Sequence, residues 1–310
     1  MRIAVPDLIS NSYFPAIAAA ELGFFKAEGL DIDKVELLFP VPKLMEALRD
    51  GAVDFVAGSA HATLMAFTDW RGAKLLGALA QHMYWLLVLR ADIDAKRGEV
   101  SALKGLRIGA APGVDLGLKR LLIEAGVDPA RDGVHIAPVP GATGATVSFG
   151  LTAAKALEEG KIDGFWANGM GAEIAVRKGV GKIILDVRRG LAPEPALHYT
   201  FPALLTTQAR IDREPESAAA AVRALVKAQQ ALRENPKRAT AIGRRVFPPS
   251  EAEIIAQLIE RDLPYYDPTI SEETVRKMNR FAMDMGLLAH DVAYEDVVAA
   301  QFRHLWSGKN

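Results

Sequence analysis

The sequence of 310 residues contains no cysteine. This absence excludes disulfides, zinc-thiolate sites and thiol nucleophiles, but it does not fix the compartment, because a disulfide-free protein can occur anywhere. An excess of charge is missing too, since 37 Lys and Arg face 38 Asp and Glu. A net charge of −1 supplies no overall field for a polyanion or an acidic membrane surface, so we expect no nucleic-acid partner.

Long apolar runs are also lacking. No stretch reaches the roughly 18 consecutive apolar residues that a transmembrane helix needs, and the richest segment, residues 83–89, is much shorter. Met1 and Arg2 lead directly into a short apolar run, without the basic start, long apolar core and cleavage site of a secretory signal. We therefore expect no membrane span, and an export signal that is either absent or left off.

One short pattern occurs twice, in residues 48–59 and 157–168. In each copy a helical run ends at a glycine, Gly51 or Gly160, an apolar strand follows, and a small polar loop leads into a new helical pattern. Two such copies predict two similar lobes that face a shared cleft. Asp54 and Asp163, which the copies share, are expected to fix turns rather than to touch a ligand.

Strand-like and helical runs alternate along most of the chain, which predicts parallel sheets covered on both faces. The predicted strands are residues 2–6, 31–39, 53–57, 74–80, 83–89, 106–112, 134–138, 162–166, 182–187 and 203–207. The predicted helices are residues 14–28, 42–49, 60–70, 116–125, 147–158, 172–177, 218–232, 239–246, 250–262 and 271–285. The pattern restarts near Leu103 and is almost wholly helical after Glu214. It therefore predicts two Rossmann-like lobes joined by a two-strand hinge: residues 1–89 plus 200–310, with the C-terminal helices packed on this lobe, and residues 90–199.

A resemblance to a known family is carried, in order, by residues 18–30, 48–54, 103–109, 157–163, 215–236, 285–288 and 291–298. Over nearly its whole length, the chain resembles the substrate-binding proteins of nitrate, sulfonate and taurine type ABC importers, which share the NMT1/THI5-like domain with thiamine-pyrimidine synthesis proteins. The resemblance is a matter of the order and spacing of these segments. It implies a type II periplasmic-binding-protein fold, with a small molecule trapped between two lobes.

The resemblance also implies a solute receptor without turnover, a membrane permease as its partner, a monomer and a periplasmic location. A cytoplasmic location is the alternative. Helix N-termini that converge on one cleft would suit a sulfonate, carboxylate or phosphate.

Loops at the expected cleft supply the candidate ligand contacts. These residues are Ser10, Asn11, Ser12, Tyr13, Ser59, His61, His82, Tyr84, Gly113, Thr143, Trp166 and Asn168. Each residue type has a structural alternative: serine and asparagine cap helices and turns, a lone histidine is often a packed structural residue, and Trp166 could be a core aromatic.

No arginine lies in these loops, so bidentate capture of an anion is not expected. The aromatic and hydroxyl side chains favour a planar or partly aromatic molecule with one anionic group over nitrate or bicarbonate alone.

Two other functions stay open. The resembled fold also hosts enzymes, including the thiamine-pyrimidine synthase and a sulfinate-cleaving enzyme, and here Asp115 could act as a base or as an ordinary helix N-terminal acid. A sensor that passes its ligand state to another protein is the second alternative. The six histidines show no metal-ligand spacing, and no glycine-rich run forms a nucleotide loop, so neither a metal nor a cofactor is expected.

Overall fold

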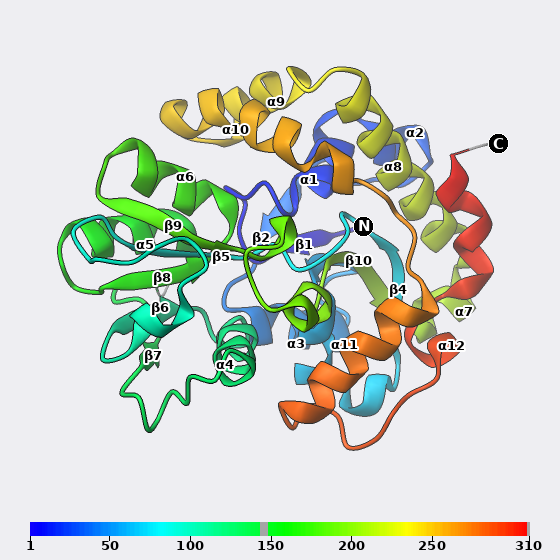
Figure 1. Ribbon diagram of the computed structural model, residues 1–310. Coiled ribbons are helices and arrows are strands. Elements are labelled where there is room, and N and C mark those ends of the chain that lie inside the picture. Colours follow the sequence, from blue (N-terminus) through cyan, green and yellow to red (C-terminus); the bar gives the residue numbers. More distant parts are fainter. Residues whose placement is uncertain (143–147, 309–310) are drawn as a thin grey trace. The chain divides into compact units, whose positions relative to one another are not determined.

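The structure is a computed structural model that describes residues 1–142 and 148–308. The chain forms two compact units. Unit 1 comprises Met1–His82 and Thr200–Asn310, and unit 2 comprises Met83–Tyr199. The chain therefore passes from one unit to the other twice. Figure 1 shows that each unit contains a sheet with helices packed around it.

Each unit contains one five-stranded sheet of the same design. The order is β2-β1-β3-β10-β4 in unit 1 and β7-β6-β8-β5-β9 in unit 2. The unit 1 strands are β1 (Ile3–Val5), β2 (Val35–Leu37), β3 (Phe55–Ser59), β4 (Ala73–Ala78) and β10 (Pro202–Thr207). The unit 2 strands are β5 (Leu86–Arg90), β6 (Arg107–Ala110), β7 (His135–Ala137), β8 (Gly164–Ala167) and β9 (Gly181–Asp186).

The antiparallel strand of each sheet is the first strand after the chain crosses into that unit from the other unit. β10 is antiparallel to β3 and β4, and β5 is antiparallel to β8 and β9, whereas β1 and β6 pair in parallel with their neighbours. The four parallel strands therefore end at the same edge at which the antiparallel strand begins. This edge is called the carboxyl edge of each sheet.

The predicted position of residues 83–89 in lobe one is wrong. β5 lies between β8 and β9 of unit 2, with Leu87 opposite Trp166 and Leu185. A fully buried strand reads as a continuous apolar run whichever sheet holds it, so the run itself carries no information about its partners.

Helices cover the sheets of both units (Figure 1). In unit 1 they are α1 (Phe14–Glu21), α2 (Phe24–Ala27), α3 (Val41–Arg49), α7 (Gln208–Arg213), α8 (Pro215–Glu234), α9 (Arg238–Val246), α10 (Pro249–Asp262), α11 (Glu272–Asp284) and α12 (Tyr294–Val297). In unit 2 they are α4 (Asp115–Glu124), α5 (Phe149–Glu158) and α6 (Gly169–Arg177). Ser271 caps α11, because its Oγ accepts a hydrogen bond of 3.0 Å from Thr274 N. Among the described residues no helix has the length and apolar character that crossing a bilayer requires.

Two predicted helices differ from the observed ones for backbone reasons. The run 14–28 breaks at Gly23, whose φ of 74° separates α1 from α2. The run 60–70 forms two short 3-10 turns, Ala60–Met65 and Thr68–Trp70. Within the second turn, Asp69 and Trp70 have left-handed φ values of 52° and 62°, which no regular helix accommodates.

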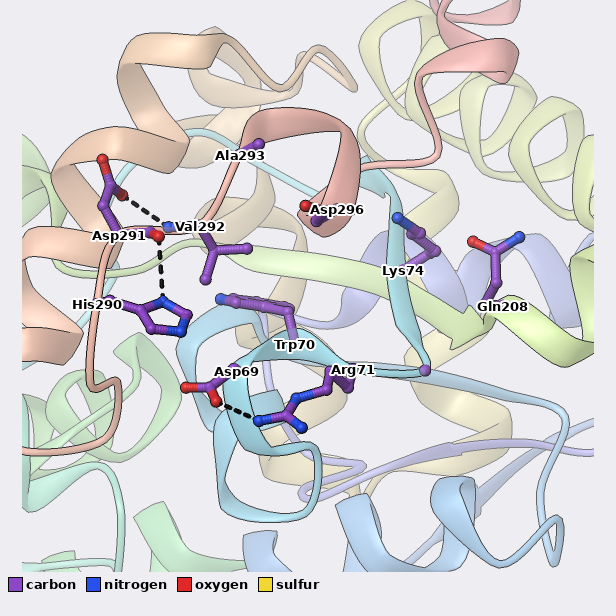
Figure 2. A pocket seen from close by; sticks show the side chains of 11 residues that line it. Asp69, Trp70, Arg71, Lys74, Gln208, His290, Asp291, Val292, Ala293 and Asp296 are labelled. Carbon is purple, nitrogen blue, oxygen red and sulfur yellow. Dashed lines mark hydrogen bonds and ion pairs between the residues drawn. The ribbon is translucent and has the colours of Figure 1, made fainter.

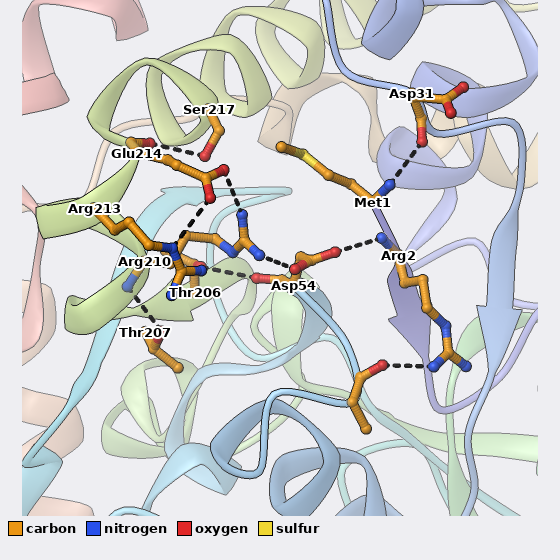
Figure 3. Close-up of polar contacts among 11 residues, drawn as sticks. Met1, Arg2, Asp31, Asp54, Thr206, Thr207, Arg210, Arg213, Glu214 and Ser217 are labelled. Atoms are coloured by element: carbon orange, nitrogen blue, oxygen red, sulfur yellow. Dashed lines mark hydrogen bonds and ion pairs between the residues drawn. The ribbon is translucent and has the colours of Figure 1, made fainter.

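The aspartates of the repeated pattern hold the starts of two equivalent strands. Asp54 Oδ2 accepts a hydrogen bond of 2.7 Å from Arg2 N, and Asp163 Oδ2 accepts one of 3.0 Å from Arg107 N. Each carboxylate also pairs with an arginine that follows or belongs to the antiparallel strand, Arg210 for Asp54 (Figure 3) and Arg90 for Asp163. Both aspartates therefore belong to the scaffold, as the repeat predicted.

Candidate functional site

At the carboxyl edge of unit 1, polar side chains are buried where strands end. Ser10, Asn11 and Ser12 follow β1, Ser59 ends β3, and Thr200 precedes β10. The sheet order brings these segments to one edge. Buried hydroxyl and amide groups are costly unless they find partners, so such a cluster is a candidate ligand site.

The loop before α1 is tied down by its own polar groups. Ser12 N donates to Ser10 Oγ at 3.1 Å, and Asn11 Nδ2 donates to Asp262 Oδ2 at 2.7 Å. Asp262 ends α10 and is itself buried, so the C-terminal helices brace this loop. Tyr13 is the N-cap of α1 without a side-chain capping bond, and its carbonyl accepts from Ala16 N at 3.1 Å.

Two buried polar atoms of this loop have no hydrogen-bond partner among the residues that the structure describes. They are Asn11 Oδ1 and Ser12 Oγ. Leaving a buried polar atom unpaired costs about 1–3 kcal/mol. A ligand or a water that hydrogen-bonds to both atoms would remove that cost.

His61 is fully buried and held by neighbours on two sides. Its Nδ1 lies 2.9 Å from Thr200 Oγ1, and its ring packs edge-on against Phe281 at 5.6 Å between centroids. Ser59, the strand-end residue, makes no capping bond to the turn that follows it. Thr200 therefore orients the His61 ring. In its neutral form this ring has one nitrogen that donates a hydrogen bond and one that accepts.

His82 is the last residue of the first segment of unit 1 and has a left-handed backbone, with a φ of 66°. Its ring contacts Tyr265 edge-on at 6.1 Å. The side chain is half-buried, so it is less enclosed than His61.

At the carboxyl edge of unit 2, three aromatic side chains pack together. The Tyr84 and Trp85 rings lie 5.2 Å apart, and the Trp85 and Trp166 rings 6.0 Å apart. Trp166 is completely buried and donates its indole N–H to Val114 O at 3.2 Å. This is the geometry of a core aromatic, so Trp166 supports the edge while Tyr84 extends the aromatic cluster toward a charged neighbour.

That neighbour is Arg188, which follows β9 and is only 5% exposed. Its guanidinium carbon lies 5.7 Å from the centre of the Tyr84 ring, which is a cation–π contact. Because β8 and β9 both run antiparallel to β5, the end of β9 lies at the same edge as Trp166 and Asn168. The loops predicted to contact a ligand contain no arginine, but Arg188 brings one to this edge from a segment outside those loops.

Three other predicted contacts in unit 2 have structural roles or fall outside the described residues. Asn168 caps α6, with Oδ1 accepting from Met170 N at 3.1 Å. Gly113 has a φ of 85° and donates its N–H to Asp115 Oδ1 at 2.8 Å, so Asp115 acts as a helix N-terminal acid. Thr143 lies outside the described residues.

Tyr199 closes unit 2 as its last residue and is buried. Burial, followed by hydrogen bonding to Glu124, raises the pKa of the Tyr199 phenol. The phenol therefore stays neutral at physiological pH.

Sequence reasoning missed Thr200, Asp262 and Arg188. The sequence does contain a signal for Arg188. It follows β9, which corresponds to β4 in the other sheet, and His82, which follows β4, is among the predicted contacts. Asp262 could not have been found, since its contact with Asn11 joins residues 251 positions apart.

Residues 10–239 match the family model described as NMT1/THI5 like. The match covers well over half of the chain. The chain belongs to the NMT1/THI5-like family. The predicted resemblance to this family is thereby confirmed.

Solved structures support the same fold for this family member. A protein from Bordetella bronchiseptica is 21% identical, with 99% of this chain and 96% of that chain covered and a TM-score of 0.77. The putative periplasmic sulfonate-binding protein SsuA from Methylobacillus flagellatus is 20% identical, with 97% and 92% covered and a TM-score of 0.66. A variant of DszB in complex with biphenyl-2-sulfinic acid is 16% identical, with both chains fully covered (100%) and a TM-score of 0.69.

These similarities establish a type II periplasmic-binding-protein fold, which serves both transport proteins and a desulfurization enzyme. No curated protein matches the chain in sequence.

Proposed function

We propose that this protein is a solute-binding receptor of an ABC importer and that its ligand is a small organic anion with a planar or aromatic part. The observation that carries the proposal is Arg188, a buried guanidinium at the carboxyl edge of unit 2, placed over the Tyr84 ring. Arginine presents a rigid fork of donors that matches a sulfonate or carboxylate in two-point geometry.

The carboxyl edge of each unit, taken by itself, holds further groups that can contact a ligand. In unit 1 these are the unpaired Ser12 Oγ and Asn11 Oδ1, together with His61 and Ser59. In unit 2 Tyr84 offers an aromatic face beside the cation. The family relationship supports a receptor, because the sulfonate-binding protein SsuA has this fold.

A receptor of this kind implies a membrane permease as partner and a periplasmic location, and both belong to the proposal. The absence of turnover belongs to it as well. Because DszB, whose variant is seen in complex with a sulfinic acid, shares the fold, an enzyme that acts on a sulfinate is the alternative, and it is favoured by the buried Ser12 hydroxyl in the loop after β1.

The proposal is tested by thermal denaturation against a panel of alkanesulfonates, aromatic sulfonates, aromatic carboxylates and pyrimidines, with product analysis of each mixture. A ligand at 100 times its Kd should raise the free energy of unfolding by about 2.7 kcal/mol. The Arg188→Gln variant should lose this shift for anionic members.

Arg189→Gln is the matched control, because the adjacent Arg189 pairs with Asp186 at 3.0 Å. It should keep the ligand-induced shift. Product formation from any member would favour the enzyme, and an anion that stabilises the Arg188→Gln variant as well as the parent would remove Arg188 from the site.

A further inference from the structure

Unit 1 contains a cavity of about 510 Å³ away from the strand ends described above. It lies beside the start of β4, at the edge of the sheet opposite Ser59 and His61. Three segments enclose it: residues 69–74, Gln208 at the start of α7, and residues 290–296 leading into α12. Its volume is within the range of sites that hold small molecules.

The wall nearest Arg71 is built on a strained turn. Asp69 and Trp70 are consecutive non-glycine residues with left-handed φ. Such conformations cost about 1–3 kcal/mol each and persist only where the surroundings over-determine them. Strain of this kind tends to accumulate at binding sites, where it sets the positions of particular side chains.

The buried side-chain amide of Asn279 links the turn to the opposite wall, because it accepts one hydrogen bond from the turn and donates two to that wall. Trp70 Nε1 donates to Asn279 Oδ1 at 3.2 Å, and Asn279 Nδ2 donates to Asp291 Oδ1 at 3.2 Å and to Val292 O at 3.0 Å. Figure 2 shows the Trp70 indole directly beside Val292, with Asp69 and Arg71 at the near rim. Two walls of the cavity are thereby fixed to one another.

The charged groups divide into those already paired and those that are not. Asp69 pairs with Arg71 at 2.7 Å, and Asp291 accepts from Asn279 Nδ2 and from its neighbour Val292 N. Lys74 and Asp296 have no ion-pair partner among the described residues, although Lys74 Nζ donates one hydrogen bond to Glu295 O. The cavity is therefore lined by a cation and an anion that do not pair with each other.

Burial lowers the pKa of the Lys74 ammonium, and Asp296 is the strongest of the charges that oppose this effect. A ligand carboxylate beside Lys74 would favour the charged ammonium further. Figure 2 shows Lys74 and Asp296 on one side of the cavity and the apolar Val292 on the other. The lining thus offers a contact for a negative group, a contact for a positive group and an apolar surface between the walls.

We propose that this cavity binds a small zwitterion of the amino-acid class, with its carboxylate at Lys74, its ammonium at Asp296 and its side chain against Val292. The proposed site is independent of Arg188 and of the solute proposed above. It would give the protein a second ligand, whose binding would be coupled to the fold through the turn at Asp69 and Trp70.

The test is isothermal titration calorimetry of the full chain with L-leucine, 4-aminobutyrate and 6-aminohexanoate, which vary the spacing of the two charges. Leucinamide lacks the carboxylate, and N-acetylleucine lacks the ammonium. At least one zwitterion should bind at millimolar concentration. If leucine is the zwitterion that binds, leucinamide and N-acetylleucine should each bind at least about tenfold more weakly than leucine. Absence of heat for all three zwitterions, or equal binding of a blocked form, would overturn the proposal.

The variants Lys74→Gln and Asp296→Asn should each weaken binding by at least about tenfold. The matched control Lys182→Gln changes the lysine at the corresponding second position of β9 and should bind as the parent does. Asp296 is exposed, so Asp296→Asn should fold normally, and unchanged binding by that variant would contradict the proposal.

The two proposals can fail separately. Arg188→Gln should leave amino-acid binding unchanged. If that variant lost amino-acid binding together with anion binding, the heat would come from the Arg188 site and the cavity would not be a second site.

Discussion

Asp163, the shared aspartate of the second copy of the repeated pattern, gives a quantitative prediction of how the Asp163→Asn substitution changes stability. The Asp163 carboxylate accepts hydrogen bonds from Arg107 N, from the Arg107 side chain at 2.9 Å and from Arg90 at 3.0 Å. Hydrogen bonding to the Arg107 side chain, opposed in part by burial, lowers the pKa of Asp163 from 3.8 to about 2. The substitution keeps a side-chain carbonyl for Arg107 N but removes the charge.

The size of the effect follows from the pKa. A difference of nearly two units corresponds to about 2.5 kcal/mol if fully expressed. The Arg107 side chain is 50% exposed, so solvent and salt screen the pair, and about 1 kcal/mol is the appropriate expectation at neutral pH. Because the folded pKa lies below the unfolded one, the contribution is fully present above about pH 5 and disappears as the pH falls through about 2.

Urea unfolding of the parent and of Asp163→Asn at a series of pH values measures this directly. The two free energies of unfolding should differ by a constant amount above about pH 5 and should converge in acid. Asp92→Asn is the control, because Asp92 pairs with the same Arg90 but its side chain is 68% exposed, and it should change stability much less than Asp163→Asn does. An equal loss at all pH values, or a loss of ligand binding at unchanged stability, would refute a scaffold role for Asp163.

Four further substitutions test the packing and one helix cap. Trp166→Ala should lower the free energy of unfolding by about 3–5 kcal/mol in the absence of ligand, as expected for a buried aromatic, and a melt within a few degrees of the parent would contradict this. Gly164→Ala would place a Cβ 2.7 Å from Val88 O and should cost about 1–3 kcal/mol or more in urea unfolding, whereas in Gly58→Ala the new atom meets the flexible end of Met45 at 3.1 Å and should cost less. Asn168→Ala should cost about 1 kcal/mol through loss of the α6 cap, measured as a shift in thermal midpoint, and no shift would mean that the cap is replaced.

Much of the fold could be predicted because its signals are local. The glycines at 51 and 160, the capping Ser271 and the alternation of apolar strands with helices each depend on a few neighbouring residues. The assignment of β5 could not be predicted in this way, because strand pairing is decided by partners far away in the sequence. The turn at Asp69 and Trp70 was missed for a related reason, since propensity alone does not predict left-handed aspartate and tryptophan.

The candidate site was predictable only as a set of loops. The repeat indicated which loops follow the strands, but whether a side chain in a loop is used by the protein or left for a ligand depends on contacts across the sheet. Asn168 is used as a cap and Trp166 as a core aromatic, whereas Ser12 Oγ has no partner among the described residues. The same reasoning applied to the end of β9 would have included Arg188.

In each unit, the residues that anchor the strands and the candidate ligand contacts lie at opposite edges of the sheet. Asp54 and Asp163 stand before β3 and β8 and hold the starts of β1 and β6, so the shared residues of the pattern lie at the edges opposite the candidate ligand contacts. Sequence changes at a carboxyl edge therefore leave these anchoring bonds intact, which allows His61 in one unit and Arg188 in the other to differ without cost to the sheets. The Lys74 cavity departs from this division, because it places unpaired charges at the amino-terminal side of unit 1. A substitution there that alters binding without altering stability would show that this edge also serves a ligand.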